Sequence, residues 1–554
     1  MAKAEAGIEP LVVILVVGRI VLALLLAGSG SLWYEAFGVV ALTFAALITE
    51  FQTYRNRLDH LKPRSSISNG ILLGAITVPT LLSARLLHMQ KYSSATGHSN
   101  IKFDFSLALA CSMSMLLRVL SLSRKQRKSS QWFGVTAFEI TCATGIFIAA
   151  IKRKALWSGL DGISWLAVYI LGGKMLFSYV LQTFPYTGTV GEVMLVVQGI
   201  VLYGAKALAA LSSSSTTKAG DEKPQDQDVI NALLQGLLLG LLAIPLLTKL
   251  IGNSLYQVFG TSEDVTRKQS RKDEYRKPRA GLFYLLLVLV VFAAVPLWVS
   301  FVTGVKVNPV VWCLQYVVGK PIPRLLLCFY WIVIIVTPLP YLCRISAQKV
   351  APTILIRKCY HVMVVFMFVP ALVVEPRFVQ LAFGIAFAAF LVLEMVRVGK
   401  LPPFSDRINN FMTAFTDHRD SGSLIISHFS LLLGCALPVW LNSGPGDRHL
   451  AGYAGILSLG VLDTVASVIG FNFGSIRVSP NSKKTLEGTL AGIGALLLSM
   501  LLVIFLLPVA ARPAGLKGYL SLIAAVTGAG VLEAYSLQLD NAFVPLLLYA
   551  LLCL

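Results

Sequence analysis

Charged residues are scarce in this sequence. Only 13% of its 554 residues are Asp, Glu, Lys or Arg, whereas 56% are hydrophobic, and the mean hydropathy is +0.74. Apolar runs of roughly 18–24 residues recur between short polar loops, which is typical of helices that cross a bilayer. Since a soluble protein could not bury so much apolar surface, the sequence predicts an all-α polytopic integral membrane protein. We expect roughly 15 transmembrane helices, within a range of about 13–17.

Cysteine motifs and the common nucleotide-binding signatures are also missing. The 8 cysteines are mostly scattered in or beside apolar runs, without CxxC spacing or a disulfide-like framework, so we expect them to be small core residues. No GxxxxGK[ST] sequence occurs, and there is no internal repeat of the kind that many transporters show. The net charge of +20 comes without a nucleic-acid recognition motif. We therefore expect no nucleic-acid partner and assign the excess Lys and Arg to cytoplasmic loops.

The apolar runs fall into two parts with different chemistry. Carboxylates, lysines and asparagines cluster in the last third, and the first third is nearly free of charge within its spans. We therefore predict an N-terminal multi-span scaffold, 1–279, and a C-terminal catalytic domain, 280–554. Spans are expected near 8–28, 32–52, 66–88, 103–122, 132–151, 160–182, 190–211, 228–251, 280–303, 325–344, 376–397, 424–442, 452–471, 489–508 and 517–536, with one more helix beginning at Arg357.

The stretch 461–490 combines an acid in an apolar run with a polar loop. The acid is Asp463, which should face protein or water and have a partner, because a charge within a membrane span is costly. The loop offers glycines, amides, a hydroxyl and two adjacent ammonium groups, which a phosphate donor with a divalent cation would require. Its candidate residues are Gly470, Asn472, Gly474, Asn481, Lys483, Lys484, Thr485, Glu487 and Gly488.

Three further polar features allow two interpretations each. Glu394 and Arg397 form either a structural ion pair or part of a polar cavity. The carboxylates of the loop 399–422 either bind a metal or are solvated. His361 follows Arg357 by four residues, on the same helical face, and is either a hydrogen-bonded interface residue or a catalyst.

Glu533 and Asp540 are the last acids of the chain. A continuous helix would place the two carboxylates two turns apart on one face. A break between them would instead place Asp540 and Asn541 at a half-helix junction, where backbone polarity lines a cavity. The sequence leaves both arrangements open.

The polar residues of the C-terminal part follow one another in a characteristic order. The order is Asp463-x-x-Ala466-Ser467, Gly470, Phe473-Gly474, Lys483-Lys484-Thr485-x-Glu487-Gly488, Glu533 and Asp540-Asn541-x-x-Val544-Pro545. It resembles the polyprenol kinase family. The chain length, the hydrophobic N-terminal part and Arg357-Lys358-x-x-His361 resemble the dolichol kinases within it. Phytol kinases share the core but are shorter, and the N-terminal part resembles the family only in hydropathy.

The resemblance implies an enzyme of the endoplasmic reticulum membrane. Such an enzyme transfers the γ-phosphoryl group of CTP to the terminal hydroxyl of dolichol or a related polyprenol, and its product, dolichyl phosphate, serves protein glycosylation. Mg²⁺ or another divalent cation would accompany CTP. The nucleotide site would face the cytosol, which the basic loop 477–484 favours independently.

The resemblance also suggests roles for single residues. Asp463 and Asp540 are the expected metal ligands or the base for the dolichol hydroxyl, and Glu533 is a further catalytic carboxylate. The expected CTP-binding residues are Gly470, Asn472, Gly474, Asn481, Lys483, Lys484, Thr485, Glu487 and Gly488, of which Glu487 would fix the loop by bonding to its backbone or to Lys484. The alternatives are a kinase for another isoprenoid alcohol, such as phytol, and a non-enzymatic transporter of an anionic solute.

Overall fold

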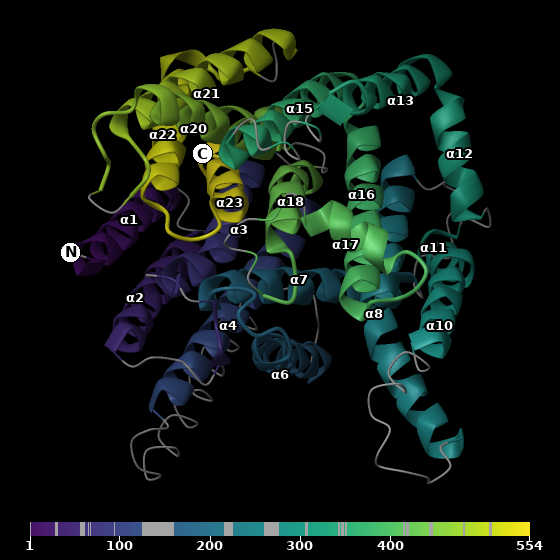
Figure 1. Ribbon diagram of the computed structural model, residues 1–554. Coiled ribbons are helices and arrows are strands. Elements are labelled where there is room, and N and C mark those ends of the chain that lie inside the picture. The colour runs from purple at the N-terminus through teal and green to yellow at the C-terminus, as the bar shows by residue number, and fades with distance from the viewer. Residues whose placement is uncertain are drawn as a thin grey trace. The chain divides into compact units, whose positions relative to one another are not determined.

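The chain folds into helices joined by turns and loops (Figure 1). Within the described residues, the only pairing of strand type is an isolated bridge between Arg477 and Thr485, so the predicted all-α class is confirmed. The computed structural model describes residues 2–554 except 28–31, 56–60, 65, 67, 93–94, 125–159, 215–224, 260–275, 305–307, 339, 342–343, 345–347, 349–351, 414–415, 417–419, 421, 443–446, 480–481 and 509–511.

Helices that could cross a membrane dominate the described part of the chain. Twelve are long and apolar enough, or 13 if the bent pair Pro309–Gly319 and Ile322–Val336 forms one span. Two shorter apolar helices are Ile426–Leu441 and Asp540–Leu552. The predicted span at 132–151 lies outside the described residues. These helices confirm a multi-pass membrane protein, for which a count of roughly 15 spans is approximate.

The chain divides into two compact units. Unit 1 comprises Met1–Leu202, Ala351–Val373 and Ser421–Leu554, and unit 2 comprises Tyr203–Val350 and Val374–Asp420. Each unit takes residues from both predicted parts of the chain. The assignment of scaffold and catalytic roles to those parts therefore stays a prediction.

Unit 1 contains the first and the last helices of the chain. The helices are α1 (Ala2–Leu26), α2 (Trp33–Arg55), α3 (Ile71–Tyr92), α4 (Ala95–Arg124), α6 (Leu160–Thr183), the first part of α7 (Val190–Ser214), α15 (Thr353–Val374), α18 (Ile426–Leu441), η4 (His449–Tyr453), α19 (Ala454–Leu457), η5 (Ser458–Leu462), α20 (Asp463–Phe473), α21 (Leu486–Leu506), α22 (Gly515–Tyr535) and α23 (Asp540–Leu552).

Helix packing in unit 1 joins segments that are distant in sequence. In the N-terminal segment, α2 packs on α3 and α4, and α3 packs on α4. In the C-terminal segment, α21 packs on α20 and α22, and α22 packs on α23. The two segments meet where α23 packs against α3 and where α1 packs against α22 (Figure 1). The beginning and the end of the chain therefore share one core.

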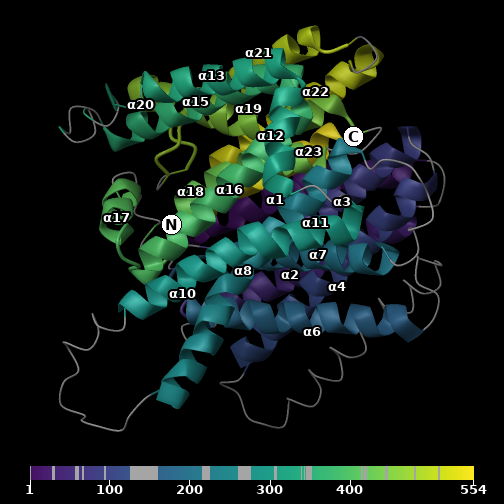
Figure 2. The ribbon, with the colours of Figure 1, turned by 90° about the vertical axis from the view of Figure 1, so that its right-hand side faces the viewer.

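Unit 2 is built around one long helix, α8 (Asp226–Phe259), which packs on α10, α11 and α16 (Figure 2). Its other elements are α10 (Arg276–Leu289), η3 (Val290–Ala294), α11 (Val295–Thr303), α12 (Pro309–Gly319), α13 (Pro321–Val336), α16 (Pro376–Gly399) and α17 (Ser405–Thr413). In α16, Arg397 and Glu394 form two hydrogen bonds of 2.7 and 2.8 Å. The structural ion pair that the sequence suggested is therefore present.

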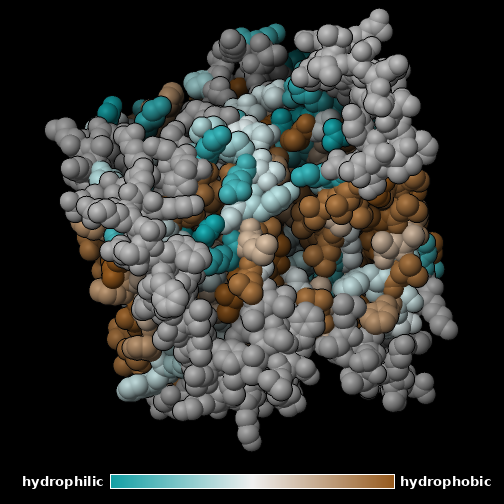
Figure 3. Space-filling view, turned by 90° about the horizontal axis from the view of Figure 1, so that it is seen from below, coloured by the Kyte–Doolittle hydropathy of each residue, from teal (hydrophilic) through white to brown (hydrophobic). Residues whose placement is uncertain are grey.

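Large apolar side chains lie on the outer surface of the described helices. Phe44 and Phe51 of α2 and Phe292 of η3 are examples of such exposed aromatic residues. Figure 3 shows apolar side chains gathered in patches on one face. Patches of this kind are unusual on soluble proteins, and the surface fits contact with lipid.

Candidate active site

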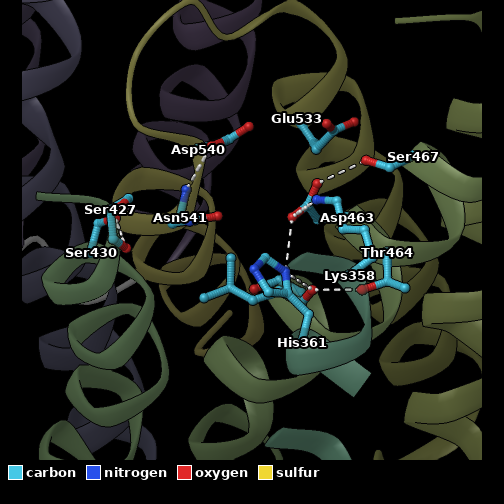
Figure 4. A network of polar contacts seen from close by, with 12 residues as sticks. Lys358, His361, Ser427, Ser430, Asp463, Thr464, Ser467, Glu533, Asp540 and Asn541 are labelled. Atoms are coloured by element: carbon cyan, nitrogen blue, oxygen red, sulfur yellow. Dashed lines mark hydrogen bonds and ion pairs between the residues drawn. The ribbon is translucent and has the colours of Figure 1, made fainter. Parts of the chain in front are cut away.

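Three carboxylates, one each from α20, α22 and α23, meet in unit 1. Asp463 begins α20, Glu533 lies in the last turn of α22, and Asp540 begins α23. One oxygen atom from each residue lies within 4.8 Å of those of the other two. Asp463 and Glu533 are buried and Asp540 is half-buried. Figure 4 shows the three side chains around a common space, so the structure brings together the three residues predicted to be catalytic.

A break between α22 and α23 creates this arrangement. α22 ends at Tyr535 and α23 begins at Asp540, so that four residues link the two helices. The second of the two arrangements left open by the sequence is therefore correct. The carboxylate of Asp540 accepts a hydrogen bond of 3.1 Å from the backbone N–H of Asn541, at the positive end of α23.

Asp463 is held by two residues of α15. The ammonium nitrogen of Lys358 lies 2.5 Å from Oδ2 of Asp463, and Nδ1 of His361 lies 3.3 Å from the same oxygen (Figure 4). The hydroxyl group of Ser467 donates a hydrogen bond of 3.4 Å to the other oxygen. Neither residue is among the predicted catalytic or metal-binding residues, although His361 was open to a catalytic interpretation and both belong to the Arg357-Lys358-x-x-His361 motif. The signal for them was their spacing of three residues, which places both on one helical face.

A π-helical turn, η5, brings α15 and Asp463 together. The wider turn lets the carbonyl oxygen of Leu459 meet two side chains, Nδ1 of His361 at 3.2 Å and Oγ1 of Thr464 at 3.4 Å. A Cβ atom at Gly460 would lie 2.0 Å from Val365 of α15, so only glycine permits this approach. Such π turns often occur at functional sites, and here the turn sets the position of the following acid.

Lys484 is the cation beside the other two carboxylates. Its ammonium nitrogen lies 2.8 Å from Oε1 of Glu533 and 3.7 Å from Oδ2 of Asp540, and it also donates to the backbone carbonyl of Glu533. Burial lowers the pKa of Lys484, but the neighbouring carboxylates of Glu533 and Asp540 outweigh it, so the pKa lies above its ordinary value. Lys484 is therefore a charged member of the cluster.

A short hairpin-like pairing turns Lys484 inward. The N–H of Val478 donates to the carbonyl of Lys484 at 3.0 Å, and the N–H of Leu486 donates to that of Ile476 at 2.8 Å. Successive side chains of an extended segment point to opposite sides. Lys484 consequently lies against the carboxylates, while Lys483 is exposed. The structure thus separates two lysines that the sequence treated alike.

Glu487 closes the loop between α20 and α21. Its carboxylate accepts hydrogen bonds from the backbone N–H groups of Ser475, at 3.0 Å, and Ile476, at 2.9 Å. The hydroxyl group of Thr485 accepts a bond of 3.3 Å from the N–H of Gly488 and caps α21. Glu487 was expected to bond either to the backbone of the loop or to Lys484, and in the structure it bonds to the backbone.

The glycines of the stretch lie where α20 and α21 touch. A Cβ atom at Gly470 or Gly474 would come within 2.8 and 2.5 Å of the side chain of Thr485. At Gly488, a Cβ atom would lie 2.4 Å from the carbonyl oxygen of Ala466. Small residues let membrane helices approach closely. These three glycines therefore have a packing role, and their predicted contact with CTP stays a prediction.

The structure describes one of the two asparagines of the stretch. Asn472 is exposed, and its amide donates a hydrogen bond of 2.9 Å to the carbonyl of Val468. Asn481 lies outside the described residues. Their predicted role in nucleotide binding remains open to test.

The chemistry of the cluster fits a divalent cation and a phosphate chain. Mg²⁺ prefers oxygen ligands at about 2.1 Å, so two oxygens on opposite sides of the ion are about 4.2 Å apart. The carboxylate oxygens, within 4.8 Å of one another, are close to that spacing. Three carboxylates face two ammonium groups, those of Lys358 and Lys484, which leaves one negative charge to attract a cation. The site can therefore hold a cation beside a lysine-bearing loop.

Sequence comparisons identify the relatives of the chain. A sequence model of the family "Dolichol kinase" matches residues 166–506. Dolichol kinase EVAN of Arabidopsis thaliana is 38% identical to this chain over an alignment of 579 positions. The alignment covers 99% of this chain and 98% of that protein. The dolichol kinase of Homo sapiens is 33% identical over 293 residues, covering 49% of this chain and 52% of its own. No solved structure matches significantly. The chain belongs to the dolichol kinase family.

Proposed function

We propose that this protein transfers the γ-phosphoryl group of CTP to the terminal hydroxyl of dolichol, with Mg²⁺ or a similar divalent cation, in the endoplasmic reticulum membrane. Membership of the family supports dolichol as the acceptor. The convergence of Asp463, Glu533 and Asp540 beside Lys484 is the observation that carries the proposal. Carboxylates for a cation and an ammonium group for phosphates are the parts that phosphoryl transfer requires.

The carboxylates would hold the cation, and α15 keeps one of them in place. Asp463, Glu533 and Asp540 supply the ligand oxygens, while Lys358 and His361 fix the orientation of Asp463. When bound, the divalent cation neutralises charge on the phosphate oxygens. The three acids come from three helices, so their spacing depends on the arrangement of the helices rather than on one flexible loop.

The loop 474–485 would hold the phosphate chain of CTP. Lys484 reaches toward it from the carboxylate side, and Lys483 is exposed and free to meet the outer phosphates. Glu487 holds the beginning of this loop, because its carboxylate accepts hydrogen bonds from the N–H groups of Ser475 and Ile476. Positive charge next to the transferred group lowers the barrier, since charge spreads over its oxygens in the transition state.

Asp540 is the proposed proton acceptor, through the carboxylate oxygen that would not hold the cation. Its side chain is the most accessible of the three acids, and its nearest ammonium nitrogen is 3.7 Å away. In the reaction, the hydroxyl oxygen of dolichol forms a bond to the γ-phosphorus and the bond from that phosphorus to the bridging oxygen breaks. CDP leaves with the bonding electron pair, and the hydroxyl proton passes to the carboxylate of Asp540. The product is dolichyl phosphate, the lipid carrier used in protein glycosylation.

The proposed nucleotide site faces the cytosol, because the basic loop 477–484 should lie on that side. We further propose that 280–554 supplies the reacting groups and that 1–279 serves as a scaffold, with the apolar helices guiding the polyisoprenoid tail. The acids of α20, α22 and α23 all lie in 280–554, which supports this assignment.

The test uses purified protein in detergent with γ-labelled CTP, Mg²⁺ and dolichol. Label in dolichol from CTP, with little from ATP and none in phytol, would support donor and acceptor together. Label in phytol would favour the alternative isoprenoid kinase. Absence of label from every lipid, with an intact fold, would favour the transporter. Asp463→Ala and Lys484→Ala should abolish the reaction without preventing membrane insertion, and normal turnover in either variant would remove that residue from the site.

A further inference from the structure

The four residues between α22 and α23 determine how Glu533 and Asp540 face each other. Glu533 precedes this link by three residues, and Asp540 follows it directly. Ser536, Gln538 and Leu539 of the link are buried. A buried link must satisfy its backbone and amide groups, because unpaired polar groups in a membrane protein core cost several kcal/mol each. The partners of the link therefore control the spacing of the two acids.

Those partners come from the N-terminal segment of unit 1. The N–H of Leu537 donates to Glu9 at 3.2 Å, and the N–H of Leu539 donates to Glu192 at 3.2 Å. The amide of Gln538 donates to the carbonyl of Ser68 at 3.1 Å and accepts from the hydroxyl of Thr189 at 2.7 Å. All four residues, Glu9, Ser68, Thr189 and Glu192, are buried. The link thus has one partner in α1, one before α3 and two at the start of α7.

The start of α7 is held in place by hydrogen bonds and an ion pair of its own residues. Thr189 and Glu192 exchange hydrogen bonds, with the N–H of Thr189 donating to Glu192 at 2.9 Å and the N–H of Glu192 to the hydroxyl of Thr189 at 3.3 Å. This Thr-x-x-Glu arrangement is a capping box. The carboxylate of Glu192 also pairs with Arg64 at 2.6 Å, with both side chains buried. Glu192 therefore cannot move without breaking this buried ion pair.

Closely packed backbone segments surround the side chain of Gln538. Gly70 has a φ of +63°, and a Cβ atom there would lie 2.4 Å from the amide of Gln538. A Cβ atom at Gly191 would lie 1.8 Å from the carbonyl oxygen of Gly70. Glu9 and Gly70 also line one small cavity together with Glu50. The segments before α3 and α7 are consequently packed backbone to backbone around one side chain.

From these contacts we infer that Thr189, Glu192 and Gln538 are positioning residues of the kinase, which set the distance between the carboxylates of Glu533 and Asp540. The inference rests on the proposed function, since it assumes that these two acids belong to the reacting centre. By this inference, the N-terminal part of the chain helps to position the reacting groups, although all of those groups lie in the C-terminal part. A displacement of about 1 Å in such a site can lower turnover on the order of a hundredfold.

The test compares three conservative variants in the full-length protein. Thr189→Val removes the hydroxyl that Gln538 accepts from, and Gln538→Met removes both amide bonds at nearly constant length. Thr189→Ser keeps the hydroxyl and should restore function. The matched control is Thr77→Val, because Thr77 is an equally buried threonine whose hydroxyl bonds only to its own helix, at the carbonyl of Leu73.

We expect Thr189→Val and Gln538→Met to lower kcat for dolichol phosphorylation on the order of tenfold or more. KM for dolichol should change much less, because Thr189 and Gln538 are buried and present no surface to a lipid. Mn²⁺ binding, followed by electron paramagnetic resonance, should weaken in the same two variants and not in Thr77→Val. Thr189→Ser should resemble the wild-type protein in both measurements.

Wild-type kcat and Mn²⁺ affinity in Thr189→Val and Gln538→Met would overturn the inference, as would an equal loss in Thr77→Val. Glu533→Gln and Asp540→Asn test the proposed function separately. If both retain turnover, the proposed site is wrong and the positioning role is wrong with it. If both are inactive but the wild-type protein binds no Mn²⁺, only the metal assignment fails, and the kcat comparison decides the positioning role.

Discussion

Lys358 and Asp463 form a close ion pair although 105 residues separate them in the sequence. The ammonium nitrogen lies 2.5 Å from the carboxylate oxygen, and both side chains are almost excluded from solvent. Asp463 therefore carries its counter-ion on a different helix, α15. The pair is the contact that joins α15 to the carboxylate cluster.

The first prediction concerns this pair. Lys358→Met should destabilise the protein by about 3–5 kcal/mol, because it leaves a buried carboxylate without its charge partner. Turnover should fall on the order of a hundredfold or more, since Asp463 loses its orientation. Thermal unfolding in detergent and the dolichol kinase assay would measure the two effects.

A matched control for this variant is Lys320→Met in α13's N-terminal flank. Lys320 also pairs with a carboxylate, that of Glu375 at 3.3 Å, but its side chain is 63% exposed. An exposed pair contributes about 0–1 kcal/mol, so stability and turnover should stay close to wild type. Equal losses in Lys358→Met and Lys320→Met would show that the loss of any paired lysine, and not the site, explains the effect.

The second prediction separates the two adjacent lysines. Lys484→Met should abolish turnover, because it removes the cation between Glu533 and Asp540. Lys483→Met should raise KM for CTP on the order of tenfold or less and change kcat little, because Lys483 is exposed. Steady-state kinetics with varied CTP would measure both. A reversal of the two phenotypes would contradict the assignment of Lys484 to the centre of the site.

The third prediction concerns pH. The pKa of Lys484 is raised above its ordinary value of 10.5, because the carboxylates of Glu533 and Asp540 outweigh the effect of burial. The charged form thus stabilises the folded protein fully below pH 10.5, and this contribution is lost as the pH rises through the higher folded-state pKa. The difference in unfolding temperature between wild type and Lys484→Met should be constant from pH 7 to about 10 and shrink above that. A difference that shrinks already below pH 9 would contradict the ion pairing.

The fourth prediction uses two glycines of α21. Gly488→Ala should destabilise the protein by about 1–3 kcal/mol or more, because its Cβ atom would meet the carbonyl of Ala466 at 2.4 Å. Gly494→Ala places a Cβ atom in open space and should stabilise the helix by up to about 1 kcal/mol. Thermal unfolding of the two variants should therefore shift in opposite directions, and shifts of one sign would refute the close packing of α20 and α21.

The fifth prediction concerns the loop that Glu487 holds. Glu487→Ala releases the N–H groups of Ser475 and Ile476, which should disorder the phosphate-binding loop. KM for CTP should rise on the order of tenfold with a smaller effect on kcat, because the residue does not touch the carboxylate cluster. Glu487→Gln keeps one acceptor oxygen and should show a smaller rise. If instead kcat falls and KM is unchanged, Glu487 takes part in the chemistry itself.

Much of the architecture was predictable from local patterns. Hydropathy predicts most spans, and the high cost of a buried charge points to Asp463, Glu533 and Asp540. The break before Asp540 was not predictable, because the link Ser536–Leu–Gln–Leu contains neither Gly nor Pro and could continue a helix. Its partners in other helices stabilise the break instead. The pairing of Lys358 with Asp463 likewise depends on packing between distant helices.

Some missed residues did have a local signal. The Thr-x-x-Glu box at Thr189 and Glu192 is readable in the sequence and predicts the start of α7. Glu9 and Glu192 are also acids within apolar runs, which by the rule applied to Asp463 should have partners. The link they bind lies at the other end of the sequence, so neither spacing nor composition could identify it.

The bond between Glu9 and Leu537 joins residues that are 528 positions apart. A ribosome adds about 5–20 residues per second, so the carboxylate of Glu9 enters the bilayer between about half a minute and two minutes before its partner exists. During that interval α1 carries, at the beginning of its apolar span Ile8–Leu26, an acid whose partner in the link between α22 and α23 has not yet been made. The buried position of Glu9 is therefore completed only when α22 and α23 arrive. Assembly of the reacting centre is thus among the last events in the biogenesis of this membrane protein.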